Sequence, residues 1–366
     1  MIVGYNYPTP CNRDGNWIGP PDRQDHWPPN YATLWKELPF KKQIAENLKT
    51  LQDNGVQVVR WFLLGNGFNY GWPPRVVSIR KRDKFDSPVQ IIDFDPPDRL
   101  DPLFLDHFQQ LLELHKTIRM QLIPSLVNYE FFATNKTARD ASGGRGDIAE
   151  DAVKRNTFLF TVLADFLSVS QHYRDFIYAW EVINEPVWDV CNLPFTPSEP
   201  PHIPYVQLNG MIAFITLALD WIKDKKFPST VGHRYLSDLS ILPTGTLPQF
   251  HYYAEHVGRF GDPPTLPTAH TAKAGIIGEF GALVGKGYES RQTPPKASYG
   301  SPWDQDFPDH RDRDPSRTVL ERLSLIKLLG YDLALAWPDL DDKFTDDTLK
   351  ISPDKLAQIK RFVSSV

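Results

Sequence analysis

The chain has few cysteines, no long apolar run and no excess of basic residues, and each absence removes a class of protein. Its two cysteines, Cys11 and Cys191, are too few for a disulfide framework or an all-cysteine zinc site. They are either two free thiols, the interpretation we favour, or one disulfide. No run of about 18 apolar residues is present, so we expect no transmembrane helix and no membrane partner. A net charge of −5 gives no basic surface for nucleic acid.

Motifs for cofactors and metals are also missing. No Gly-x-Gly-x-x-Gly loop follows the first predicted strand, and acidic clusters such as "DFDPPD" lack calcium-loop or zinc spacing. We therefore expect no cofactor and no metal. The first residues, "MIVGYNYPTP", lack the basic start and apolar core of a secretory signal. The expectation is a cytoplasmic protein, or a secreted one whose signal has been removed.

Proline and aromatic residues are abundant instead. There are 33 prolines in 366 residues, well above the usual share of about 5%, and aromatic residues reach 13%. Hydrophobic residues make up 41%, which is ample for a globular core. Long proline-rich loops and an aromatic surface for a ligand are the features that this composition favours.

Eight short apolar runs predict buried strands. Most are continuous rather than alternating, as expected for parallel strands covered on both faces. They are Ile2–Asn6, Val56–Leu64, Met120–Val127, Phe176–Ile183, Thr230–Tyr235, Pro248–Tyr252, Gly275–Phe280 and Asp332–Trp337.

Longer amphipathic stretches between these runs predict helices. In the first of them, Ile44, Leu48 and Leu51 share one face, and Gly55 marks the end. Only "LSDLSILPTGTL" separates the fifth and sixth strands, so the helix there must be short or degenerate. The predicted helices are Lys41–Asp53, Pro102–Lys116, Ile148–Ser170, Tyr205–Lys225, Ser316–Leu329 and Pro353–Ser364.

This alternation predicts a closed (β/α)8 barrel formed by one domain, residues 1–366. An open, doubly wound sheet is the alternative. The links that follow strands are long, whereas those that follow helices are short, and in a barrel the former all lie at one end, where active sites are built. The long links are 7–40, 65–100, 128–147, 186–204 and 281–315.

Two glutamates close predicted strands. Glu185 follows the fourth strand in "WEVINEP", and Glu279 ends the seventh in "IIGEFG". Asn-Glu-Pro alone is a weak signal, but two carboxylates at one end of a barrel can flank one bond of a substrate. One must be protonated to act as an acid while the other stays ionised. Glu181, four residues before Glu185, is expected on the same strand face, as an ion-pair partner inside the barrel.

"WEVINEP" together with "IIGEFG" resembles the clan of retaining β-glycosidases that fold as (β/α)8 barrels. Arg60 in "VVRWF", His251 and Tyr253 in "QFHYY", and Trp337 in "LALAWPD" match further positions of that clan. The segments "LIPSLVNYEFF" and "YRDFIYAWEVINEP" look most like its cellulase and endo-β-mannanase branch. That branch often has a histidine after the third strand or after the acid/base, and Asn128 and Trp188 occupy those places here.

The resemblance implies a cofactor-free retaining glycoside hydrolase that acts on a β-linked glycan or oligosaccharide, with β-mannan or β-glucan favoured. Glu279 would be the nucleophile and Glu185 the acid/base. Arg60 and Tyr253 would hold Glu279 ionised, His251 would orient Glu185, and Asn184 would bind the sugar 2-hydroxyl. Trp337 would form the floor of the sugar site. The other candidates for substrate contact, at or beyond strand ends, are Asn128, Trp61, Trp188 and Trp303.

Other interpretations of the same residues remain open. Glu185, Glu279 and Arg60 could form a buried structural ion cluster, His251 could be an ordinary core histidine, and loop tryptophans could serve packing alone. A sugar-binding barrel without hydrolysis, a transglycosylase with the same site, and a barrel enzyme of different chemistry such as a metal hydrolase are the alternative functions.

Overall fold

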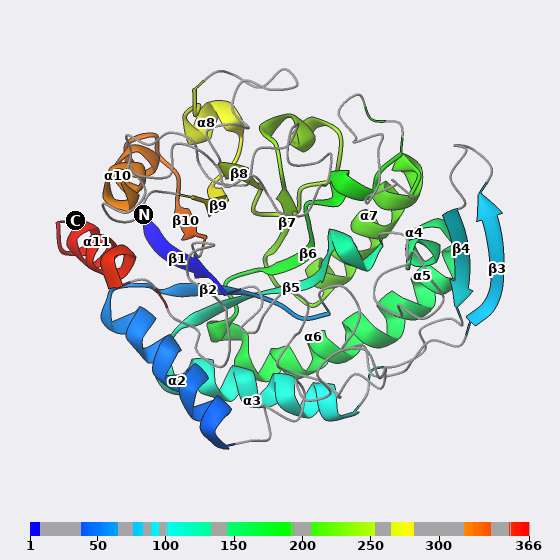
Figure 1. Ribbon diagram of the computed structural model, residues 1–366, viewed down its shortest axis with the longest axis horizontal. Helices are drawn as coiled ribbons and strands as arrows, with labels where there is room; N and C mark the ends of the chain where they lie inside the picture. Colours follow the sequence, from blue (N-terminus) through cyan, green and yellow to red (C-terminus); the bar gives the residue numbers. More distant parts are fainter. Residues whose placement is uncertain are drawn as a thin grey trace, which may run out of the picture.

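The structure is a computed structural model. It describes residues 1–7, 38–64, 76–82, 89–94, 100, 102–132, 145–191, 193, 206–252, 265–281, 318–337, 351 and 353–365. Eight of the described strands close into a barrel, and each strand is parallel to both of its neighbours (Figure 1). The predicted (β/α)8 barrel is therefore confirmed.

Each barrel strand overlaps one of the predicted segments. Around the barrel they follow the order β1-β2-β5-β6-β7-β8-β9-β10, and β10 closes back onto β1. Their bounds are β1 Ile2–Asn6, β2 Val58–Phe62, β5 Gln121–Asn128, β6 Trp180–Asn184, β7 Ser229–His233, β8 Gln249–Tyr252, β9 Ile276–Phe280 and β10 Leu333–Ala336.

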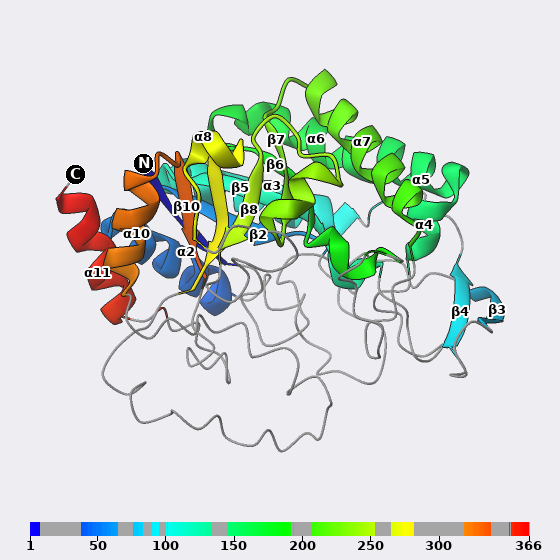
Figure 2. The ribbon, with the colours of Figure 1, turned by 90° about the horizontal axis from the view of Figure 1, so that it is seen from above.

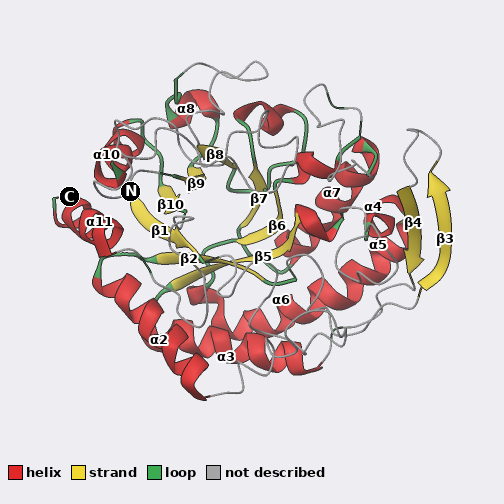
Figure 3. Cartoon of the chain, viewed as in Figure 1, coloured by secondary structure: helices red, strands yellow, loops and turns green. Residues whose placement is uncertain are grey.

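Helices surround the strands, as Figures 1 and 3 show from the same side. In α2, Ile44, Leu48 and Leu51 are fully buried, which is the face that the sequence predicts. Gly55 follows the helix with φ 94°, a conformation that favours glycine. The longer helices are α2 Leu38–Asp53, α3 Pro102–Ile118, α7 Leu208–Asp224, α10 Val319–Leu328 and α11 Pro353–Ser364.

The predicted helix 148–170 is wrong as one continuous element. It is divided into α4 (Gly146–Glu150), α5 (Ala152–Phe158), the π-helical turn η3 (Leu159–Leu163) and α6 (Ala164–Ser170). The break lies at Asp151, whose backbone is extended and whose carboxylate accepts hydrogen bonds from the Val153 and Lys154 amides. Aspartate competes for these amides as an N-cap, so it starts a new helix instead of continuing the old one.

Two further regions bear on the prediction of the links. Between β7 and β8 the only described helix is the 3-10 turn η6 (Leu236–Ser240), as expected for the degenerate unit. The link 65–100, by contrast, contains an antiparallel pair, β3 (Val76–Arg82) and β4 (Val89–Phe94), that we did not predict. Both segments are rich in β-branched residues, which favour strands.

The apolar core has two layers. The larger lies between the outer face of the barrel and the helices. The smaller fills one end of the barrel interior and consists of Val58, Ile123, Ile276, Leu333 and Leu335. Side chains alternate along a regular strand such as β2, so Val58 points inward and Val59 outward.

The chain ends lie on the same side of the molecule. In Figures 1 and 2, α11 lies beside α10 and near the start of β1. Of the helices in the described part of the chain, none has the length and apolar character needed to cross a membrane.

Candidate active site

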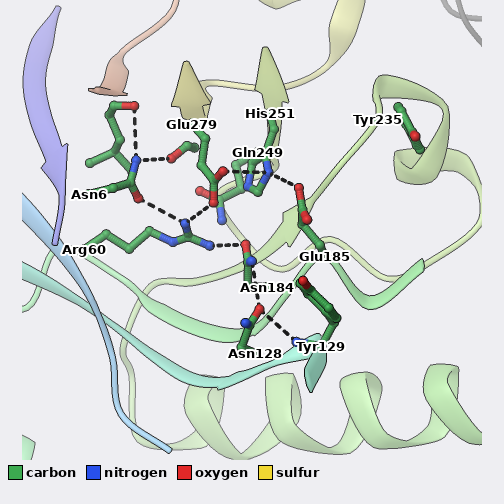
Figure 4. Close-up of polar contacts among 12 residues, drawn as sticks. Asn6, Arg60, Asn128, Tyr129, Asn184, Glu185, Tyr235, Gln249, His251 and Glu279 are labelled. Carbon is green, nitrogen blue, oxygen red and sulfur yellow. Dashed lines mark hydrogen bonds and ion pairs between the residues drawn. The ribbon is translucent and has the colours of Figure 1, made fainter. Parts of the chain in front are cut away.

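Polar side chains fill the barrel interior beyond its apolar layer. Asn6 ends β1, Arg60 lies two residues after Val58 on β2, and Asn184 ends β6. His251 and Glu279 come from β8 and β9 (Figure 4). All are less than 5% exposed. These residues lie toward the carboxyl ends of parallel strands, the end at which barrels build their sites.

A bulge in β9 turns Glu279 into the barrel. Register shifts against both neighbours show an extra residue in β9, because Ile277 pairs with Phe250 and Glu279 with the next residue, His251. Without the bulge, Ile277 and Glu279 would face the same way, and Ile277 packs in the outer core. The extra residue therefore places the carboxylate inside.

A similar shift places Asn184 in β6. Glu181 pairs with Thr230 and Asn184 with Gly232, so β6 uses one residue more than β7. Val182 and Ile183 both pack in the outer core, whereas Glu181 and Asn184 both contact Arg60 inside. Side chains in β6 therefore do not follow the plain alternation from which we predicted one face for Glu181 and Glu185, although Glu181 is the predicted ion-pair partner inside the barrel.

Glu185 itself leaves the strand in a strained conformation. Its φ is 48° and its ψ is 51°, in the left-handed region, and its side chain is buried. The other described non-glycine residues with positive φ are exposed and follow helix ends: Arg119, Lys226 and Lys273. A left-handed residue costs on the order of 1–3 kcal/mol, and such strain is concentrated at functional sites. The Glu185 amide donates to the Gly232 carbonyl at 2.7 Å, which ties the turn to β7.

Arg60 is the centre of the buried network. Its five N–H groups meet five acceptors on four side chains, and Figure 4 shows the bonds to Asn6, Asn184 and Glu279. Nη1 donates to Asn6 Oδ1 at 3.0 Å and Glu279 Oε1 at 2.7 Å. Nε and Nη2 donate to the two oxygens of Glu181 at 2.9 and 2.7 Å, and Nη2 also donates to Asn184 Oδ1. A guanidinium has five donors, so this set satisfies it completely.

Glu181 is in turn held from the other side. Ser125 Oγ donates to its Oε1 at 2.6 Å, and Gln249 Nε2 donates to its Oε2. Gly232 leaves room for this arrangement, because a Cβ there would lie 2.9 Å from Arg60 Nη2 and 3.2 Å from Glu181 Oε2. Both ions are fully buried, and their hydrogen bonds supply the compensation that buried charge requires.

Glu185 has a different kind of neighbour. His251 Nδ1 lies 2.8 Å from Glu185 Oε1 and 3.5 Å from Glu279 Oε2, so the imidazole bridges the two glutamates. Trp188 Nε1 donates to the other oxygen of Glu185, Oε2, at 2.8 Å. One ligand atom from each of Glu185, His251 and Glu279 can be chosen so that all three lie within 4.8 Å of one another. The two carboxyl groups are thus close enough to act on one substrate bond.

The electrostatics of the network are unequal. Burial raises the pKa of the Glu279 carboxyl above its ordinary value; His251 and Arg60 oppose the rise, and the Glu185 carboxyl adds to it. Burial also works against the charge of Arg60, but Glu181 and Glu279 raise the pKa of its guanidinium above the ordinary value. Arg60 is therefore a permanent positive charge, whereas the Glu279 carboxyl gives up its proton less readily than an exposed glutamate does.

Three side chains could also hold a metal ion, since Glu185, His251 and Glu279 offer the carboxylate and imidazole ligands that zinc accepts. The charge of Arg60, 2.7 Å from Glu279, opposes a second cation there. The arrangement suits proton transfer and attack by a carboxylate better than metal binding.

Most residues predicted for the catalytic step come together in the structure. Glu185, Glu279, Asn184, Arg60 and His251 form one connected set of contacts. The predicted contacts of Arg60 with Glu279 and of His251 with Glu185 are present. Tyr253 and Trp303 lie outside the described residues.

The structure does not bring all of the predicted substrate contacts to the site. Trp61 has no exposed surface and packs against Tyr7 in the outer core, with ring centroids 5.2 Å apart, so the prediction of sugar contact is wrong. It neighbours Arg60, which points inward, and alternation sends Trp61 outward. Asn128 accepts from Asn184 Nδ2 at 3.0 Å and from the Tyr129 amide at 2.9 Å, and so braces Asn184. Trp337 is half-buried directly after β10.

Three polar members of the network were not predicted. Asn6 donates through Nδ2 to the Gly278 and Leu335 carbonyls, at 3.1 and 3.2 Å, and joins β1 to the bulged strand. Ser125 and Gln249 hold Glu181. A signal existed for each, because a polar residue inside a strand that is otherwise apolar must find a partner.

The fold and its site define a (β/α)8 barrel with a pair of buried glutamates at the carboxyl ends of the strands. No protein-family model and no curated protein matches the chain. Its fold is similar to that of the β-mannanase from the blue mussel Mytilus edulis, with a TM-score of 0.61 and 14% identity over 100% of this chain and 92% of that one.

Two other solved structures have the same fold. The β-1,4-D-mannanase from Cryptopygus antarcticus has a TM-score of 0.57 and 13% identity, over 98% of this chain and 89% of that one. A GH5 family lichenase from Caldicellulosiruptor sp. F32 has a TM-score of 0.54 and 11% identity, over 99% and 92%. At such identities the likeness is one of fold.

Proposed function

We propose that the chain is a retaining β-glycosidase in which Glu279 is the nucleophile and Glu185 the acid/base, with residues 1–366 forming one catalytic domain. The observation that carries the proposal is that one carboxyl oxygen of Glu185 and one of Glu279 lie within 4.8 Å of each other. Retaining enzymes hold this pair about 5–5.5 Å apart, whereas inverting enzymes need about 6.5–9.5 Å to admit a water. The short separation favours retention.

In the first step, a carboxylate oxygen of Glu279 attacks the anomeric carbon. The bond to the leaving oxygen breaks with its electron pair, and the proton of Glu185 moves to that oxygen. Arg60 holds Glu279 Oε1 at 2.7 Å, which leaves Oε2 to form the new bond. A buried and pre-oriented arginine supports the ionised form of the nucleophile at no cost in reorganisation.

In the second step, Glu185 accepts a proton from water while the water oxygen attacks the anomeric carbon. The bond to Glu279 breaks, and the carboxylate is restored with net retention. The amide of Asn184 contributes one N–H to Asn128, and among the described residues its second N–H has no recorded partner. We assign that N–H to the 2-hydroxyl of the sugar, whose hydrogen bond strengthens in the transition state.

The proposed substrate class rests on similar structures and on one tryptophan. Several structures with this fold are named as β-mannanases, a lichenase and an endoglucanase. These names support a β-linked mannan or glucan, or an oligosaccharide of either. Trp337 also supports it, because this residue is half-buried and its amide donates to the carbonyl of Phe280, next to Glu279. A panel of aryl β-glycosides and oligosaccharides measures this directly.

The test of the nucleophile is the Glu279→Ala variant with an activated aryl β-glycoside that the wild type cleaves. We expect turnover to fall at least about 10³-fold, because no covalent intermediate can form. Glu46→Ala is the matched control, since Glu46 is exposed on α2 and pairs only loosely with Lys42, at 3.7 Å. Near wild-type turnover in the Glu279→Ala variant would show that the assignment is wrong.

A further inference from the structure

Trp188 contacts the acid/base in a way that the sequence does not reveal. It lies in the 3-10 turn η5 (Pro186–Asp189), which follows the strained Glu185 directly. Its indole N–H donates to Glu185 Oε2 at 2.8 Å, and its side chain is 7% exposed. The predicted role of this tryptophan was sugar contact, but little of its surface is available for that.

Arg234 covers the indole ring. Its guanidinium carbon lies 3.6 Å from the centroid of the Trp188 ring, and Arg234, which follows β7, is 3% exposed. A cation at this distance over a tryptophan is strongly attracted to the ring, more so when both are buried. The stack fixes the plane of the indole and draws electron density from it, which strengthens the N–H as a donor.

We propose that Trp188, held in place by Arg234, is a positioning residue that selects Glu185 Oε1 as the oxygen that carries the transferable proton and sets how firmly that proton is held. The proposal rests on the proposed function of Glu185. It concerns residues that do not touch the reacting atoms.

The choice of oxygen follows from the chemistry of indole. An indole N–H can only donate, so Oε2 must offer it a lone pair in both protonation states of Glu185. In the protonated acid, the carbonyl oxygen is the better acceptor, which leaves the proton on Oε1. Oε1 is also the oxygen on the nucleophile's side, because His251 Nδ1 lies 2.8 Å from it and 3.5 Å from Glu279 Oε2.

The hydrogen bond from Trp188 to Glu185 also determines how firmly Glu185 holds its proton. A hydrogen bond to a carboxylate favours the ionised form, so Trp188 makes Glu185 a stronger acid than burial alone would allow. The positive charge of Arg234 acts in the same direction through the ring. The proton therefore leaves readily in the first step, and Glu185 can still recover it from water in the second.

The experiment is the pH dependence of kcat/KM for Trp188→Phe, measured with an aryl β-glycoside that has a poor leaving group. Phenylalanine keeps an aromatic ring but removes the N–H. We expect the basic limb to move to higher pH by about one unit and kcat to fall about tenfold, with KM within about twofold. Trp221→Phe is the matched control, because Trp221 lies on α7 and meets Phe160 edge to face, with ring centroids 4.8 Å apart.

Arg234→Met tests the role of the cation that covers the indole, and it still tests the proposal if Trp188→Phe does not fold. It should move the basic limb in the same direction by a smaller amount, and the double variant should move it no further than Trp188→Phe alone. Arg174→Met is its control, since Arg174 stacks on Phe227 at 4.4 Å in the turn before β6.

Two results would overturn the proposal. One is an unchanged basic limb in both Trp188→Phe and Arg234→Met. The other is a large rise in KM at an unchanged limb, which would make Trp188 a sugar contact. Glu185→Gln and Glu279→Ala run in the same assay separate this outcome from failure of the proposed function, because both lose activity if that function is right.

Discussion

The two glutamates at the mouth of the barrel differ in what holds them. Glu279 receives a hydrogen bond at 2.7 Å from Arg60, a fully buried positive charge. Glu185 instead contacts the uncharged indole N–H of Trp188 and the imidazole of His251, at 2.8 Å each. A fixed positive charge suits a group that must attack as an anion, and an uncharged donor such as the indole N–H suits a group that must gain and lose a proton.

The backbone differs in parallel with the side chains. Glu279 is inside β9, where a bulge turns it inward, while Glu185 lies beyond β6 in a left-handed conformation. Glu279 is paired with His251 of β8, so its backbone is fixed within the sheet. The Glu185 amide donates to Gly232 of β7, and its side-chain contacts add to this anchor. One barrel mouth can therefore hold an anion, Glu279, and a proton donor, Glu185, a few ångströms apart.

The largest expected effect comes from replacing each glutamate in turn, which tests the difference in their roles. Glu279→Gln should lose at least about 10³-fold of activity on every aryl glycoside, because it removes the attacking carboxylate. Glu185→Gln should lose about 10³-fold on poor leaving groups but much less on activated ones, which need no protonation. Steady-state kinetics on a series of leaving groups measures both. Equal losses of Glu185→Gln across the series would contradict its role as the acid.

The next largest effect removes the charge that distinguishes Glu279. Arg60→Met leaves Glu181 and Glu279 buried without their shared cation, and breaking a buried ion pair costs about 3–5 kcal/mol. We expect the free energy of unfolding, measured in urea at neutral pH, to fall by this amount. Arg60→Lys keeps a charge but cannot make five bonds, and it should fall between wild type and Arg60→Met. Wild-type stability in Arg60→Met would mean that the network contributes nothing.

A smaller change disturbs the network without removing a charge. Gly232→Ala would place a Cβ 2.9 Å from Arg60 Nη2, which is locked by its bonds, so we expect a loss of about 1–3 kcal/mol in unfolding free energy. Gly275→Ala is the control, because its Cβ would meet only the carboxylate of Asp332, an exposed side chain that can turn away. Equal stability of the two variants would argue that Arg60 has room to move.

The smallest effect is on stability against pH. Because burial raises the pKa of Glu279, the folded state binds its proton more tightly than the unfolded state does. The stability that this group contributes is thus present at low pH and is lost as the pH rises from about the ordinary value of 4.5 through the raised one. Glu279→Gln cannot ionise, so it should gain on wild type over that range, by at most about 1.4 kcal/mol per pH unit. Urea unfolding at several pH values would refute this if wild type gained instead.

The strands of the barrel and most residues of the site could be predicted from the sequence. The directions of some side chains could not, for physical reasons. Apolar runs locate all eight strands, because burial on both faces leaves a clear pattern. The motifs around Arg60, Glu185, His251 and Glu279 identify the residues of the site. The bulges in β6 and β9 leave no such pattern, so the inward turn of Asn184 and Glu279 becomes visible only in the register.

Tryptophans mark the limit of prediction most clearly. Trp61 and Trp188 both lie near strand ends, and from this position the sequence predicts the same role for both, contact with the sugar. One faces the outer core and the other donates to Glu185, because alternation and a strained turn decide their directions. Asp151 likewise starts a helix inside a stretch whose periodicity predicts an unbroken one. At Asp151 a local polar contact overrides the periodicity.

The most direct test of the central claim is the configuration of the glycosyl azide formed by the alanine variant of each glutamate. With an activated aryl β-glycoside and azide, Glu279→Ala should give the α-azide, since azide attacks in place of the nucleophile with one inversion. Glu185→Ala should give the β-azide, since azide replaces water at the covalent intermediate and the second inversion restores the configuration. Proton NMR distinguishes the two anomers. A β-azide from Glu279→Ala together with an α-azide from Glu185→Ala would contradict the assignment.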